Sequence, residues 1–81
     1  MELPLSALSR DECAYISKVN GQPDMVRRLS ELGFLPGTGV CCELISPAGF
    51  PAAYRVRGAL IALRKKDADM VIVTPVGERE A

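Results

Sequence analysis

The chain has 81 residues, with ten acidic side chains, ten basic side chains, no histidine and 48% hydrophobic residues. This length suits one domain with a small core, and this hydrophobic content is typical of a folded chain rather than a disordered one. Zero net charge gives no global attraction to nucleic acid or to an acidic membrane surface. The lack of histidine removes the commonest metal ligand and the commonest general base.

No apolar run approaches the ~20 residues that a membrane-spanning helix needs. The N-terminal sequence MELPLS has neither the basic region nor the apolar region of a secretion signal. The cysteines are Cys13, Cys41 and Cys42, an odd number. We therefore expect reduced thiols in a cytosol rather than a disulfide framework, with Cys13 in the core or on a strand surface.

The first half of the chain predicts one strand and one helix. Residues 1–10 form a short lead-in, which Pro4 interrupts, and residues 12–19 alternate as a first strand does. Residues 23–32 predict a helix, because their apolar side chains fall on one stripe. Gly33 is expected to end this helix, and Phe34 to fold back on Leu29.

The glycine-rich stretch RLSELGFLPGTGV follows the helix instead of preceding it. A phosphate-binding loop needs its glycines ahead of a helix, where free N–H groups face the anion. We therefore interpret Gly33 as a helix stop and residues 35–38 as a type II turn, with proline second and glycine third.

Short strands fill the rest of the chain. They are predicted at 40–45, 52–57, 59–64 and 70–74, with a polar turn at 65–68. Arg55 and Arg57 would then share one strand face. Pro75 is expected to end the last strand, and residues 77–81 to form a frayed tail. About five short strands with one helix after the first favour a small, partly closed β-barrel.

The order VRRLSELG, FLPG, YRVRG and ALIALRKKDADMVIV resembles the FeoA family, whose members are encoded beside the FeoB ferrous iron transporter of bacteria. The resemblance runs from the first strand to about Val73. It implies a mainly β fold, a small SH3-like β-barrel of about five strands with one helix inserted after the first strand. A single domain would span residues 1–81.

The resemblance also implies a function. The chain would be a cytoplasmic accessory or regulatory protein of ferrous iron uptake that contacts the cytoplasmic part of a FeoB-type transporter. The same module forms the C-terminal domain of DtxR-type metal-dependent repressors. Because this chain lacks their helix-turn-helix part, we expect a stand-alone protein. A metal-responsive regulator domain and a small nucleic-acid-binding barrel are the alternatives.

Catalytic and metal-binding residues are not expected. The carboxylates are scattered, and no histidine exists to activate a cysteine nucleophile. Adjacent Cys41 and Cys42 would point to opposite faces of a strand and would not ligate one ion together. We therefore expect no enzyme activity, no cofactor and no resident metal, although surface carboxylates could hold a divalent ion weakly.

Protein contact is the expected mode of action, without nucleic acid and without insertion into a membrane. Candidate partner-binding residues lie at the helix-end turn and along a basic edge. They are Leu35, Pro36, Gly37, Arg55, Arg57 and Arg64. Phe50, in a proline- and glycine-rich loop, is either a core plug or an exposed anchor. An exposed sheet edge could also pair with a second copy of the chain.

Overall fold

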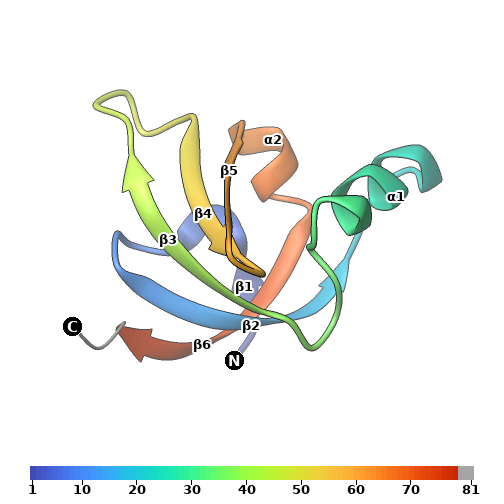
Figure 1. Ribbon diagram of the computed structural model, residues 1–81, viewed down its shortest axis with the longest axis horizontal. Helices are drawn as coiled ribbons and strands as arrows, with labels where there is room; N and C mark the ends of the chain where they lie inside the picture. The colour runs from blue at the N-terminus through green and yellow to red at the C-terminus, as the bar shows by residue number, and fades with distance from the viewer. Residues whose placement is uncertain (79–81) are drawn as a thin grey trace.

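The computed structural model describes residues 1–78, which form one six-stranded antiparallel sheet with two α-helices and a short 3-10 helix (Figure 1). The elements are β1 (Leu3–Pro4), a 3-10 helix (Leu5–Ala7), β2 (Glu12–Val19), α1 (Pro23–Glu31), β3 (Gly39–Ile45), β4 (Ala52–Val56), β5 (Ala59–Leu63), α2 (Lys65–Ala68) and β6 (Val71–Glu78). None of the helices in this part of the chain is long and apolar enough to cross a bilayer.

The strands lie in the order β1-β6-β2-β3-β4-β5, so β1 and β5 are the two edges of the sheet. The sheet is curved and SH3-like, although its edge strands do not pair to close a barrel. The predicted fold class is therefore confirmed, with α1 after the first long strand. Strand β1 was not predicted from the sequence, and it pairs with β6 through Leu3–Val73 and Pro4–Ile72. Much of the expected lead-in is thus ordered, and Leu5 and Leu8 are buried.

Helix α1 ends as its sequence predicts. Gly33 has a φ of 113°, a conformation that residues with a side chain resist. The Gly33 N–H donates to the carbonyl of Ser30 over 3.0 Å, and the Phe34 N–H donates to the carbonyl of Leu29 over 2.9 Å. This bond pair is a Schellman cap. Phe34, which was expected to fold back on Leu29, is joined to it by this backbone bond, and both side chains are buried in the same core cluster.

The turn after α1 is anchored on β2. The Thr38 N–H donates to the Leu35 carbonyl over 3.0 Å, and Gly37 has a φ of 88°, as a type II turn requires. The Gly37 N–H donates to the Ile16 carbonyl over 2.7 Å, and the Ile16 N–H donates to Thr38 over 2.9 Å. The exposed residues of this turn are therefore held on a rigid support.

Strands β4 and β5 form a hairpin with a two-residue turn. Val56 pairs with Ala59, and the intervening Arg57 and Gly58 have φ angles of 50° and 81°. Two positive φ angles mark a type I′ turn, whose twist matches that of the flanking strands. The expectation that Arg57 shares a strand face with Arg55 is wrong, because Arg57 lies in the turn.

Strand β6 continues through Pro75 to Glu78, so the prediction that Pro75 ends the strand is wrong. Strand β1 opposes only Ile72 and Val73, so no partner strand lies beside Pro75 on that side. The pairing with β2 also shifts register at Ala14, the partner of Pro75. Proline is tolerated at such an edge or bulge. Part of the expected frayed tail thus lies in β6, and residues 79–81 of that tail lie outside the described residues.

The core lies between the concave face of the sheet, α1 and the N-terminal segment. Its largest fully buried side chains are Tyr54, Phe34, Leu5, Leu29, Val40, Val56, Val71, Val73 and Cys42. Burial of each leucine, valine and phenylalanine among them stabilises the fold by about 1.5–3 kcal/mol. Phe50 is half-buried and packs against this core, so the structure favours the core plug over the exposed anchor.

Cys13 and Cys41 form a disulfide, which contradicts the expectation of free thiols. The two residues are direct partners in the β2–β3 pairing, with Cα atoms 4.0 Å apart. A spacing this short is typical of a non-hydrogen-bonded pair, where side chains meet across the strands. Counting cysteines could not reveal this register. Cys42 is buried on the opposite face of β3, as strand alternation predicts.

Candidate protein-docking surface

The turn between β4 and β5 lies beside the C-terminal end of α1. A methyl group added at Gly33 would come within 3.3 Å of the Arg57 Cδ atom and 3.6 Å of a Val56 methyl. The Arg57 side chain therefore lies beside Gly33, at the end of α1. We call this surface the corner, made of Leu32, Leu35, Pro36, Gly37 and Arg57.

The corner combines apolar and cationic groups. Leu32 and Leu35 keep 39% and 37% of their surface exposed, and Pro36, Gly37 and Arg57 are also exposed. The Arg57 cation lies near the C-terminal end of α1, where the helix dipole favours positive charge. Such a surface suits a protein partner that offers apolar side chains beside a carboxylate.

Arg55 lies farther along the hairpin and has structural partners. Its Nε donates to Glu43 Oε2 over 2.8 Å, and its Nη1 reaches the Gly58 carbonyl at 3.4 Å. These contacts tie β4 to β3 and to the hairpin turn. Arg55 is therefore oriented by the sheet, while 42% of its side chain stays exposed.

Arg64 lies at the opposite end of β5 from Arg57, at the N-cap of α2. It begins a basic run with Lys65 and Lys66, all three being exposed. Of the six predicted residues, Leu35, Pro36 and Gly37 therefore share one turn, and Arg57 lies beside Gly33, which precedes that turn. Arg55 lies within the sheet, and Arg64 lies at the far end of the edge strand.

The apolar surface around β5 was not among the predicted residues. Leu60 keeps 44% of its surface exposed, and Leu44 on β3 keeps 51%. Ala59 and Ala62 are exposed as well. The signal was present in the sequence, because the run ALIAL lacks the polar alternation of a half-buried strand.

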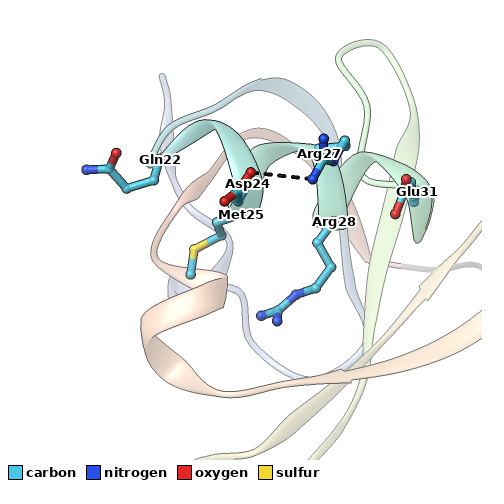
Figure 2. Close-up of a pocket in the computed structure, with 6 residues that line it drawn as sticks. All are labelled: Gln22, Asp24, Met25, Arg27, Arg28 and Glu31. Atoms are coloured by element: carbon cyan, nitrogen blue, oxygen red, sulfur yellow. Dashed lines mark hydrogen bonds and ion pairs between the residues drawn. The ribbon is translucent and has the colours of Figure 1, made fainter.

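A shallow hollow lies along α1 (Figure 2). Its lining residues are Gln22, Asp24, Met25, Arg27, Arg28 and Glu31. Arg27 Nη2 and Asp24 Oδ1 form an exposed ion pair of 3.4 Å, while Met25 and Arg28 extend below the helix in this view. The mixed charges give no paired acid and base and no anion site of one sign.

Cys42, Tyr54 and Asp69 have shifted pKa values. Burial, and then the charges of Asp11 and Glu12, raise the pKa of the Cys42 thiol. Burial raises the pKa of Tyr54 well above its usual range. Hydrogen bonds from the Ser6 hydroxyl and from Lys65 lower the pKa of Asp69. Cys42 therefore stays a protonated thiol at neutral pH, which makes it a poor nucleophile and a poor metal ligand. Within residues 1–78, no group of three or more cysteine or carboxylate side chains is arranged to hold a metal ion.

The family model of the FeoA domain matches residues 3–75. The chain belongs to the FeoA family. None of the curated proteins matches its sequence.

Solved structures of FeoA proteins share this fold. FeoA of Stenotrophomonas maltophilia, described as a prokaryotic SH3 domain protein and complexed with zinc, is 32% identical, with 89% of each chain covered and a TM-score of 0.79. FeoA of Chlorobium tepidum is 27% identical, with 96% of this chain and 74% of that chain covered and a TM-score of 0.85. A manganese-dependent transcriptional repressor is 13% identical, with 93% of this chain and 41% of that chain covered and a TM-score of 0.85, a likeness of fold alone.

Proposed function

We propose that this FeoA protein is a cytoplasmic accessory or regulatory protein of ferrous iron uptake. It acts by contact with the cytoplasmic part of a FeoB-type transporter and adjusts the activity or assembly of that transporter. It is not an enzyme, and its function needs no resident cofactor. In a reducing cytoplasm, the Cys13–Cys41 pair would be a dithiol at rest.

The corner is the observation that carries this proposal. The fold holds exposed Leu35 and Pro36 on a turn with four backbone hydrogen bonds to or within it. The Arg57 side chain lies beside Gly33, which precedes this turn. A rigid support of this kind lowers the entropy that ordering a docking site would cost. The family assignment supports a role in iron transport, because one similar solved structure carries the name iron(II) transport protein A.

An NMR titration tests the proposal. The chain is labelled with 15N and titrated with the isolated cytoplasmic domain of the FeoB-type transporter from the same source. We expect shifts that cluster at Leu35, Gly37 and Arg57. A second titration with ferrous iron alone, under anaerobic conditions, is expected to leave these signals in place.

Two results would contradict the proposal. One is a titration in which the transporter domain shifts no signal of the chain. The other is a titration in which iron alone shifts residues beside the carboxylates or the cysteines while the transporter domain changes nothing. That second pattern would favour a metal-responsive regulator domain.

A further inference from the structure

Strand β5 is an uncovered edge of the sheet. It pairs with β4 on one side and has no strand on the other. All five of its residues pair with β4 without a register shift, whereas the β2–β6 and β3–β4 pairings each contain shifts. Its sequence ALIAL has no charge and no proline. Edge strands are normally protected by charged side chains or by proline, because an open edge can pair with another chain.

The opposite edge of the sheet is protected. Strand β1 has only two residues, one of which is Pro4. Beyond β1, the edge continues along β6, where Pro75 offers no N–H group and Gly77 has a φ of 120°. The contrast singles out β5 as the edge that can accept a further strand.

The hairpin geometry identifies the groups that β5 offers. In a two-residue hairpin the residues that flank the turn, here Val56 and Ala59, exchange hydrogen bonds. Partners then alternate along the strand, so Leu60 and Ala62 direct their N–H and C=O groups away from β4. Both residues are exposed.

The charges at the ends of β5 select the occupant. Arg57 precedes the strand, and Arg64, Lys65 and Lys66 follow it, all of them exposed. Of these four cations, Lys65 alone forms an ion pair within the described part of the chain, with Asp69 at 3.0 Å. A second copy of β5 would place cations against cations in either orientation. An extended segment with acidic residues at both ends would instead be attracted at both ends.

We propose that β5 binds an extended apolar segment with acidic flanks, which adds a seventh strand to the sheet. The segment lies in the cytoplasmic part of the transporter partner, so this inference rests on the function proposed above. Main-chain hydrogen bonds to Leu60 and Ala62 supply the affinity. Alternate side chains of the segment lie beside Leu60 on the outer face of the sheet, and the acidic flanks meet Arg57 and Arg64.

Two probes test the inference on the full 15N-labelled chain. The first is the transporter's cytoplasmic domain. The second is the synthetic peptide Glu-Asp-Thr-Val-Thr-Val-Thr-Asp-Glu, with two control peptides, one carrying lysine at every acidic position and one carrying proline at both valines. With each of the two probes we expect the amide hydrogen exchange of Leu60 and Ala62 to slow by about tenfold or more. Neither control peptide is expected to slow it.

Matched variants separate edge pairing from nonspecific effects. Ala62→Pro removes an outward N–H and should weaken peptide binding about tenfold, while Ala62→Val keeps the N–H and should bind as the wild type does. Arg64→Glu/Lys66→Glu should also weaken binding by about tenfold. Arg10→Glu/Lys18→Glu changes the net charge equally, away from β5, and should leave binding unchanged. The two charge variants, Arg64→Glu/Lys66→Glu and Arg10→Glu/Lys18→Glu, test the inference even if the proline variant fails to fold.

The outcomes are distinguishable. Shifts at the corner with the transporter domain, but unchanged exchange at Leu60 and Ala62 with both probes, would overturn the edge inference and leave the proposed function standing. Protection by the peptide, with no response to the transporter domain, would support the edge as a strand-binding site but overturn the transporter as its source. Concentration-dependent protection of β5 without any partner would show self-pairing and would also overturn the inference.

Discussion

The Cys13–Cys41 disulfide should contribute a large share of the stability of this domain under oxidising conditions. The perturbation is the double substitution Cys13→Ser/Cys41→Ser. The two cysteines are 28 positions apart, and closing a loop of this size removes enough entropy from the unfolded chain to stabilise the fold by about 3.5 kcal/mol. A domain of this length has a total unfolding free energy of about 4–12 kcal/mol. The bond would therefore account for about 30% to 90% of that total.

The assay is urea unfolding of the wild type with and without a reductant, beside the double variant. Without reductant, we expect the wild type to exceed the double variant by about 3.5 kcal/mol, equivalent to roughly 15–25 °C in Tm. With reductant, the two proteins should be similar. Thiol counting on the unfolded, unreduced wild type should find only Cys42 reactive.

The control is Cys42→Ala, which removes a buried thiol but leaves the disulfide in place. Its unfolding free energy should be lower than that of the wild type, yet it should keep the dependence on reductant. Equal stability of the wild type and the double variant without reductant would refute the reasoning. It would mean that the pairing of Cys13 with Cys41 does not constrain the unfolded chain.

Two further predictions concern the helix end and the N-terminal segment. Gly33→Ala should destabilise the fold by about 1–2 kcal/mol in urea unfolding, because Gly33 has a φ of 113° and a new methyl would crowd Arg57. Gly39→Ala, whose methyl would meet Tyr15 at an ordinary 3.7 Å, should change it by less than about 0.5 kcal/mol, and equal effects would contradict the assigned cap. The Asp69 carboxylate has a pKa below its ordinary value of 3.8, so the stability that it contributes is complete above that value and is lost as the pH falls through the lowered pKa. Unfolding midpoints between about pH 5 and pH 2 should therefore fall more steeply in the wild type than in Asp69→Asn, and parallel curves would count against the bond from Ser6.

Local signals in the sequence were sufficient for the helix and its end. Pro23 at the first turn, one apolar stripe and Gly33 with Phe34 are features of neighbouring residues, and the structure has the helix, the cap and the turn as predicted. The period-2 pattern likewise predicted β2 with its observed bounds. These elements follow from short-range rules, which a single sequence carries in full.

Features that depend on distant partners were not predicted. The disulfide needs the β2–β3 register, which places Cys13 opposite Cys41. The edge position of β5 needs the strand order of the whole sheet. Composition and spacing specify neither of these, because each is set by which strands become neighbours. The position of Arg57 is a local feature that was predicted wrongly, because the type I′ turn moves it off the strand face that Arg55 occupies.

The dissociation constant between this chain and the transporter's cytoplasmic domain tests the central claim most directly. Calorimetry would compare the wild type with Leu35→Ser/Arg57→Asn, since asparagine suits the positive φ of Arg57 in the turn. The control, Val76→Ser/Arg10→Asn, makes equivalent changes at exposed sites away from the corner. We predict a Kd about tenfold or more weaker for the corner variant and an unchanged Kd for the control. Equal Kd values for the corner variant and the wild type, or no binding by the wild type, would contradict the account.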